Sequence, residues 1–206
     1  PFTILGGSLH FWRSHPAEWP RRLQLLRQCG FNTVSTYLPW NLLEPRPGEF
    51  VNFDLHPELD YVKFIKEAET VGLLVSIRAG PYITAEHDFG GYPWWLIQND
   101  SVTRATTFRT TALWFTSLVD RYWDHAIPPL APLIYTQGGP IISFQIDDDT
   151  SGPGGECNTS LPECKYYGYL PYLRDGLRRR GIVDIPITTV GFSPNAQTSG
   201  VLQTIE

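Results

Sequence analysis

Short apolar runs alternate with amphipathic patterns along the whole chain, and this alternation limits the fold more than any other feature. Strands are expected at Ile4–Arg13, Asn32–Leu38, Leu73–Ile77, Pro140–Ile146 and Ile185–Val190. Helices are expected between them, at Pro16–Gly30, Pro57–Val71, Thr106–Ala126 and Tyr166–Arg180. Such alternation predicts βαβ units around a parallel sheet, so the fold class is α/β.

Two parallel architectures fit these five units. A (β/α)8 TIM barrel usually needs about 250 residues, so a chain of 206 residues would cover about the first five βα units. An open doubly wound sheet would need no further chain. Neither a G-x-G-x-x-G motif after the first strand nor a phosphate-binding loop is present, which weighs against that second architecture. The polar tail Gly191–Glu206 receives no assignment.

Composition excludes several classes of function. The chain is 42% hydrophobic, which suffices for a sizeable core, and its net charge is −5. Without a basic stripe, nucleic acid is not an expected partner. No apolar run approaches the ~20 residues that a membrane helix requires, so no membrane span is expected. A chain that begins at Pro1 and has no Met is expected to be processed or to be part of a longer polypeptide.

The stretch Ile77–Leu96 (IRAGPYITAEHDFGGYPWWL) is where a buried strand gives way to a polar and aromatic loop. Parallel sheets build their sites in this way, because the strand fixes a loop that meets solvent. A second interpretation stays open at this point. The loop could be purely structural, with Glu86 solvated and with Trp94 and Trp95 packed in the core.

Polar side chains follow three successive strands of the predicted sheet. Tyr37 ends the second strand, Glu86 follows the third, and Asp147, Asp148 and Asp149 follow the fourth. In a barrel these positions face one rim, where active sites are built. Carboxylates beside tryptophans suit a sugar, and a pair of carboxyl groups is what glycoside hydrolysis uses. The alternative for the Asp triplet is a solvated turn, since Asp is a turn residue.

Other chemistry is not indicated. The five histidines show no metal-ligand spacing, no Ser-His-Asp arrangement is visible, and we expect neither a metal nor a cofactor. Cys157 and Cys164 flank a short polar segment and could close a small disulfide loop. Asn99 and Asn158 each begin an N-x-S/T glycosylation triplet. Together these features favour an extracellular or lysosomal location.

The stretch RAGPYITAEHDFGGYPWWL resembles a motif of the β-galactosidase family of the lysosomal and plant cell-wall type, R-x-G-P-Y-x-x-A-E-W-x-x-G-G-x-P-x-W-L. Two further stretches, Thr33–Phe50 and Gly138–Ile146, are similar to the family's N-T-V-x-T-Y-V-P-W-N-x-H-E-P-x-x-G and G-G-P-I-I-x-x-Q-V. The resemblance runs from Gly6 to the fifth strand. The first motif is matched by Arg78, Gly80, Pro81, Tyr82, Ala85, Glu86, Gly90, Gly91, Pro93, Trp95 and Leu96.

The resemblance implies a (β/α)8 barrel and a retaining enzyme that removes terminal β-galactose, with a β-galactoside or another glycan as its partner. By position, Tyr37 and Glu86 would contact the galactose. The family continues with Q-V-E-N-E-Y-G, in which the last Glu donates the proton and the Asn holds the sugar's 2-hydroxyl. Here Asp148 takes the place of that Asn and Asp149 the place of the donor Glu, and His87 replaces the family's Trp.

Two hypotheses about activity follow. Asp149 is one methylene shorter than Glu, and misplacing a catalytic group by about 1 Å can cost on the order of a hundredfold in rate. The parent protein is therefore either a β-galactosidase-type hydrolase or a catalytically inactive homologue that binds glycans or serves as a structural module outside the cell. A third hypothesis, an unrelated barrel glycanase, fits the matched motif less well.

The nucleophile of the resembled family lies on the seventh strand, which we expect beyond Glu206, and Glu206 itself is not assigned that role. An open barrel of five strands would expose a sheet edge and half its interior. Residues 1–206 are accordingly expected to be the N-terminal part of a single barrel domain, with the remainder of the same polypeptide as their partner.

Overall fold

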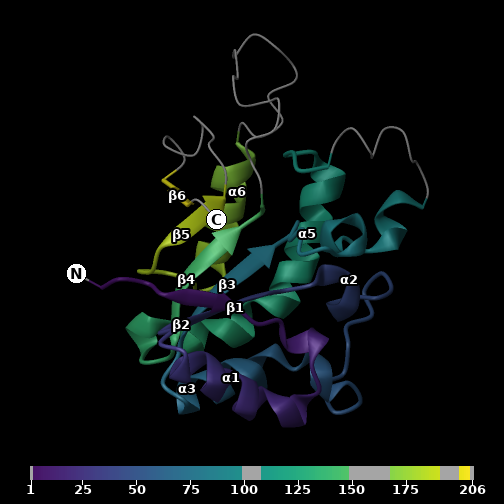
Figure 1. The fold of residues 1–206 in the computed structure, drawn as a ribbon. Helices are drawn as coiled ribbons and strands as arrows, with labels where there is room; N and C mark the ends of the chain where they lie inside the picture. Colours follow the sequence, from purple (N-terminus) through teal and green to yellow (C-terminus); the bar gives the residue numbers. More distant parts are fainter. Residues whose placement is uncertain (1, 99–107, 149–167, 191–199, 205–206) are drawn as a thin grey trace.

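Six parallel strands form one curved sheet, and the chain adds them in sequence order. The computed structural model describes residues 2–98, 108–148, 168–190 and 200–204. Every neighbouring pair of strands is parallel, and no strand is inserted out of order. This order confirms the predicted TIM-barrel class, whereas a doubly wound sheet would reverse its order at a switch point. The strands are β1 (Gly6–Ser8), β2 (Thr33–Tyr37), β3 (Leu74–Gly80), β4 (Ile141–Ile146), β5 (Ile187–Val190) and β6 (Leu202–Thr204) (Figure 1).

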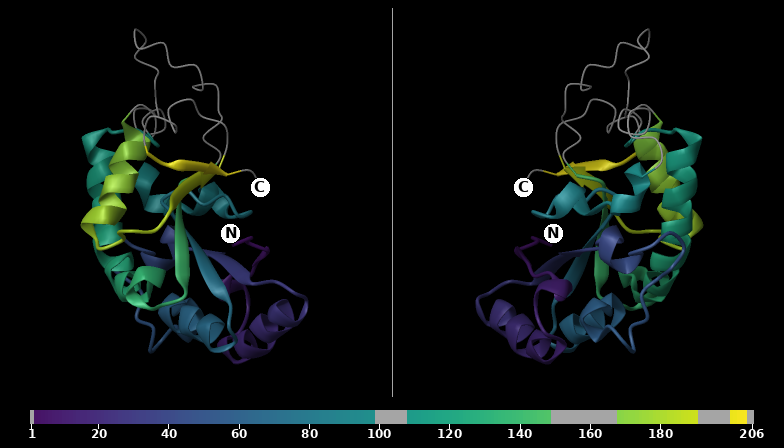
Figure 2. Two further views of the ribbon diagram at one scale, coloured as in Figure 1. Left: turned by 90° about the vertical axis from the view of Figure 1, so that its left-hand side faces the viewer. Right: turned by 90° about the vertical axis from the view of Figure 1, so that its right-hand side faces the viewer.

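Helices cover the outer face of the sheet, and none of the long helices in the described part of the chain lies on the opposite face (Figure 2). Four long helices lie there: α1 (Trp19–Gln28), α3 (Tyr61–Thr70), α5 (Leu113–Ala126) and α6 (Tyr169–Arg179). A single turn, α2 (Trp40–Leu43), follows β2. Short 3-10 turns complete the connections: η1 (Phe11–Arg13), η2 (Pro16–Glu18), η3 (Pro57–Leu59), η4 (Asp88–Gly91), η5 (Trp94–Ile97), η6 (Pro128–Leu133) and η7 (Tyr135–Gln137).

The helix α3 shows how the sequence sets these elements. Its N-cap is Asp60, whose carboxylate accepts a hydrogen bond of 2.9 Å from the backbone N–H of Lys63. Such a cap satisfies one of the free N–H groups at a helix start. Its apolar face packs into the core through Tyr61, Phe64, Ile65 and Ala68. The chain leaves the helix at Gly72, with φ of +76°.

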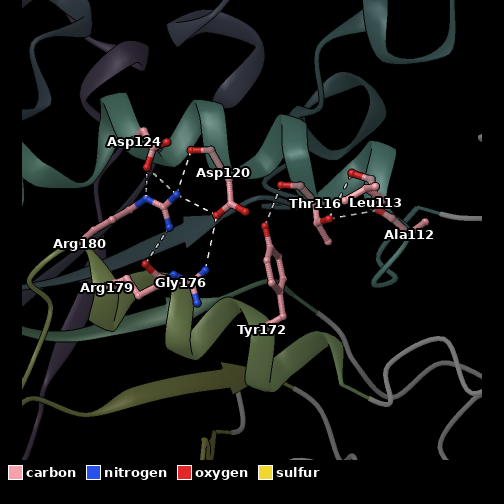
Figure 3. Close-up of polar contacts among 9 residues, drawn as sticks. All are labelled: Ala112, Leu113, Thr116, Asp120, Asp124, Tyr172, Gly176, Arg179 and Arg180. Atoms are coloured by element: carbon pink, nitrogen blue, oxygen red, sulfur yellow. Dashed lines mark hydrogen bonds and ion pairs between the residues drawn. The ribbon is translucent and has the colours of Figure 1, made fainter.

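Helices α5 and α6 are joined by a polar clamp (Figure 3). Arg180, just after α6, donates to the carboxylate of Asp120 at 2.8 Å and to that of Asp124 at 2.9 Å. The Tyr172 hydroxyl donates to the backbone carbonyl of Thr116 at 2.8 Å. The Arg180 side chain is only 8% exposed, whereas the carboxylates of Asp120 and Asp124 are 35% and 70% exposed, so water is excluded from the guanidinium more than from its acceptors.

The inner face of the sheet is polar at two levels. The lower level is a row of serines in register across four strands, and the hydroxyls of Ser76 and Ser143 are 2.8 Å apart. Two residues further along, Tyr37, Arg78 and Gln145 stand in register. Side chains two apart on a strand share a face. Tyr37, Arg78 and Gln145 therefore lie on the inner face above the first row, and we call this second level the mouth. The first row consists of Ser8, Ser35, Ser76 and Ser143.

Several predicted boundaries change. The first strand shortens to Gly6–Ser8 because the chain turns into η1 at Phe11. The third strand runs on to Gly80, three residues past the expected end. The polar tail contributes β6, a sixth strand that the pattern did not indicate.

Candidate functional site

The site begins with a buried arginine at the carboxyl end of β3. Arg78 is 2% exposed, and its guanidinium carbon lies 4.0 Å from the centroid of the Tyr37 ring. Cation and aromatic face attract one another at this distance. Because Tyr37 and Arg78 are register partners on β2 and β3, the parallel sheet itself brings them together.

The arginine pairs with the first residues after β4. Its Nη1 lies 3.0 Å from Oδ2 of Asp148, with the two side chains 2% and 8% exposed. The same Nη1 donates to the backbone carbonyl of Ile83 at 2.8 Å. The hydroxyl of Thr84 also donates to Oδ2 of Asp148. These contacts use Oδ2, and Oδ1 has no partner in the described part of the chain.

A left-handed turn carries Glu86. Thr84, Ala85 and Glu86 have φ of 55°, 52° and 47°, and the N–H of His87 donates to the carbonyl of Thr84 at 2.9 Å. The left-handed region costs a residue with a side chain about 1 kcal/mol or more. Strain of this kind persists only where surrounding contacts impose it, and it gathers at functional sites. Glu86 is exposed at the mouth, whereas Ala85 is buried.

Aromatic rings line the mouth beside this turn. The ring of Trp12 stacks on that of His10 at 4.7 Å and lies 5.6 Å from that of His87. His10 also lies against Tyr37, at 4.5 Å between ring centroids. Burial, with the nearby charge of Arg13, lowers the pKa of His10 to about 4. Burial also lowers the pKa of His87. The His10 ring is therefore neutral above about pH 4, and burial favours the neutral form of His87 as well.

Asp147 plays a different part from its neighbour. It is fully buried, and its carboxylate pairs with Arg109, with Nη2 at 3.1 Å from Oδ1. Burial raises the pKa of Asp147, and the Arg109 charge opposes that rise. Oδ1 also accepts the N–H of Asp148 at 2.8 Å. Arg109 stacks on the ring of Tyr82 at 4.7 Å, so this pair ties the end of β4 to the loop after β3.

The structure thus brings Tyr37, the turn of Glu86 and Asp148 to one rim, linked through Arg78. The structural reading of the loop holds in part: Glu86 is solvated and Trp95 is 6% exposed, but Trp94 is 59% exposed. Five residues predicted from the sequence to have a role lie outside the described residues: Asp149, Cys157, Cys164, Asn99 and Asn158.

Sequence reasoning missed Arg78 and Thr84 as members of the site. One signal was available for Arg78, because a charged residue inside the apolar run LLVSIRAG must find a partner. Thr84 carried no such signal. Within the described ranges, no three His, Cys, Asp or Glu side chains gather as they would around a metal ion. Nor is any helix there long and apolar enough to cross a membrane.

Comparisons with known proteins find related sequences. The sequence model described as "Glycosyl hydrolases family 35" matches residues 1–175. Human "Beta-galactosidase-1-like protein 3" is 41% identical over 206 residues, covering 99% of this chain and 29% of the human protein. Rice "Beta-galactosidase 8" is 37% identical over 207 residues, covering 98% of this chain and 28% of the rice protein. The chain therefore spans under a third of the length of these relatives.

Solved structures support the fold. An exo-β-1,4-mannosidase from Opitutaceae bacterium strain TAV5 superposes with a TM-score of 0.63 at 18% identity, over 91% of this chain and 32% of that one. The β-galactosidase from the psychrophilic Marinomonas ef1 gives 0.59 at 14% identity, over 92% and 38%. At these identities the likeness speaks for the fold alone.

Proposed function

The chain belongs to glycosyl hydrolases family 35, and on this premise we propose that it is part of a β-galactosidase-like enzyme that removes terminal β-galactose with retention of configuration. One observation carries the proposal. Tyr37, the turn that presents Glu86, and Asp148 meet at the carboxyl ends of adjacent parallel strands, where barrel enzymes hold their substrates.

Each residue has a role in this proposal. Tyr37 and Glu86 contact the galactose, and Asp148 accepts a sugar hydroxyl through Oδ1. Asp149 donates the proton to the leaving group. A carboxylate outside residues 1–206 is the nucleophile, since retention requires a second carboxyl group about 5–5.5 Å from the first.

The barrel is completed, we propose, by further strands of the same polypeptide. Two strands between β6 and β1 would bring the count to the eight that a barrel needs. Exposed apolar side chains at the two edges of the sheet support this closure. Ile4 and Leu5, just before β1, are 54% and 55% exposed, and Leu202 on β6 is 58% exposed. The greater length of the relatives supports it as well. Residues 1–206 then form the N-terminal part of one barrel domain.

The alternative function is a catalytically inactive homologue that binds glycans or serves as a structural module. The observation that favours it is the altered donor segment, in which Asp149 stands where the family has a longer carboxylate. For either function we propose a place in the secretory pathway, extracellular or lysosomal. The glycosylation triplets at Asn99 and Asn158 support that location, and we propose a disulfide between Cys157 and Cys164 to go with it.

The test is turnover of an aryl β-galactoside by the full-length polypeptide. We expect hydrolysis, and a loss of kcat/KM of at least about tenfold in Glu86→Gln, because the carboxylate is lost from the mouth. Glu69→Gln on the exposed side of α3 is the matched control and should leave kcat/KM unchanged. Absence of turnover, with intact galactose binding, favours the inactive homologue. Activity unaffected by Asp149→Ala would remove Asp149 as the proton donor.

A further inference from the structure

We propose that Asp148 is a positioning residue: through the hydroxyl of Thr84 and the guanidinium of Arg78 it holds the left-handed turn that presents Glu86 to the sugar. This inference rests on the proposed function, in which Glu86 contacts the galactose. It goes further because it assigns the carboxylate of Asp148 a partner set within the protein and makes Thr84 part of the site.

The contacts around Oδ2 of Asp148 carry the argument. This one oxygen accepts from the Thr84 hydroxyl and lies 3.0 Å from Nη1 of Arg78. The same Nη1 holds the carbonyl of Ile83 at 2.8 Å, one residue before the turn begins. Asp148 therefore holds two successive residues at the start of the turn. It binds Thr84 directly, and it binds Arg78, which in turn binds Ile83.

Asp148 is itself held firmly enough to act as an anchor. It is 5% exposed and directly follows Asp147, whose buried carboxylate accepts the N–H of Asp148 at 2.8 Å. The carbonyl of Asp148 accepts a hydrogen bond from Arg109. The backbone of Asp148 is thus fixed by Asp147 and Arg109, which lie outside the turn, and Arg78 on β3 holds its carboxylate.

The turn needs such anchors because its backbone is unfavourable. Three consecutive residues with side chains have positive φ, and each costs about 1 kcal/mol or more relative to a right-handed conformation. Contacts hold the turn on either side of Glu86. Arg13 donates to the carbonyl of Ala85, and the ring of His87 lies 3.4 Å from the Asn41 amide. Without the hydrogen bond from Thr84 to Asp148, the turn would relax, and the Glu86 carboxylate would move with it.

The carboxylate at position 148 also does what an amide could not. Arg78 is 2% exposed, and a buried guanidinium requires a compensating negative charge. An asparagine would still accept the Thr84 hydroxyl but would not supply a negative charge 3.0 Å from that guanidinium.

A matched pair of variants at Thr84 tests the proposal in the full-length polypeptide. Thr84→Val removes the hydroxyl and keeps the shape, whereas Thr84→Ser keeps the hydroxyl. The ligand is isopropyl β-D-thiogalactoside, which is not hydrolysed, and calorimetry measures its Kd. We expect Thr84→Val to weaken binding by about tenfold or more, since a displaced group loses most of its contact. Asp148→Ala also loses the proposed contact of Oδ1 with the sugar and should weaken binding at least as much. Thr84→Ser should stay within about twofold.

A double-mutant cycle separates positioning from general stability. In a Glu86→Gln background, Thr84→Val should weaken binding by less than about twofold, because the carboxylate it positions is absent. Hydrogen exchange of the free protein gives a second readout. The amides of Ile83 and His87, which bond to Gly90 and Thr84, should exchange faster in Thr84→Val and Asp148→Ala but not in Thr84→Ser.

The outcomes distinguish the two proposals. If the wild type does not bind the thiogalactoside while exchange changes as expected, the proposed substrate is wrong and the positioning role stands. If Glu86→Gln weakens binding but Thr84→Val changes neither binding nor exchange, the positioning role is overturned and the proposed function stands. Equal effects of Thr84→Val with and without Glu86 would also overturn it.

Discussion

Gly90, in η4, shows how little room the loop after β3 leaves for change. A β-carbon built on Gly90 would lie 1.8 Å from Cε2 of Tyr82, and the residue has φ of +62°. Its carbonyl accepts the N–H of Ile83 at 2.9 Å. Tyr82 in turn carries the guanidinium of Arg109 over its ring. A glycine is therefore required here both for its backbone conformation and for this close approach.

We expect Gly90→Ala to destabilise the protein by about 2 kcal/mol or more, because overpacking adds to the cost of positive φ. The control is Gly48→Ala, at φ of +78° with no atom within 4 Å of the added carbon. It should cost about 1 kcal/mol from the backbone alone. Thermal unfolding measures both, and equal losses would contradict the steric part of the explanation.

The buried ring of His10 should make the stability of the fold sensitive to acid. Its pKa is lowered to about 4, first by burial and then by the positive charge of Arg13 and Arg78. The unfolded chain binds this proton near pH 6.5, and the folded chain only near pH 4. Stability from the neutral ring is thus complete above about pH 6.5 and is lost as the pH falls toward 4.

Replacing His10 removes this proton. We expect the Tm of His10→Gln to fall less than the wild-type Tm between pH 6.5 and pH 4, whatever the difference at neutral pH. A series of thermal scans across that range measures the slope. Parallel curves for the two proteins would mean that His10 does not carry the acid sensitivity.

The sequence predicted the residues of the rim better than the contacts among them. The sequence placed Tyr37 at the end of one strand and Glu86 and Asp148 after the next two, and the parallel sheet brings those strand ends together. The pairing of Arg78 with Asp148 depends on which side chains share an inner face and how far they reach. The contact of Thr84 depends on a left-handed turn of residues that rarely adopt one, so no local pattern indicates it.

At the level of elements, Arg180 makes several of the polar contacts between α5 and α6. Arg180 donates to two carboxylates, to the carbonyl of Gly176 at 2.8 Å and to that of Asp120 at 3.0 Å. Its guanidinium also lies 5.9 Å from the ring of Trp123. Charged hydrogen bonds of this kind are stronger than bonds between neutral groups, particularly when shielded from water.

We expect Arg180→Ala to lower the free energy of unfolding by about 2 kcal/mol, because two backbone carbonyls and two carboxylates lose a charged donor that is itself 8% exposed. Arg179 is the matched control, since its side chain is 56% exposed and its ion pair with Asp120 is 3.7 Å long. Arg179→Ala should change stability by less than about 0.5 kcal/mol. Chemical denaturation gives both values, and similar losses would refute the clamp.

Element prediction succeeded where periodicity was long and failed where elements were short. The helix α3 has four buried positions at helical spacing, so its existence was readable. The strand β6 has only three residues, too few to show alternation. The end of β3 differs because the strand continues through Arg78 to Gly80, past the apolar run that gave the predicted end.

At the level of the whole molecule, the described sheet has two free edges. The apolar side chains of Phe2, Ile4 and Leu5 beside β1 are 54–62% exposed, and Leu202 on β6 is 58% exposed. Free strand edges next to apolar surface promote association. The proposed closing strands would cover both edges at once.

We therefore expect residues 1–206, produced alone, to bind the dye ANS strongly and to associate. The full-length polypeptide should bind little dye and unfold at a higher temperature, since its edges are paired. Fluorescence titration and light scattering compare the two. A monomeric fragment without dye binding would contradict closure by further strands.

The most direct test of a sugar site at this rim is a crystal structure of the full-length polypeptide soaked with galactose. Our account predicts density for the sugar between Tyr37 and Glu86, with the Oδ2 of Asp148 still held by Thr84 and Arg78. The chain offers another hollow, of about 510 Å³, lined by residues such as Phe53, Tyr61 and His125, which shares no lining residue with the rim. Galactose bound there, with the rim empty, would contradict the account.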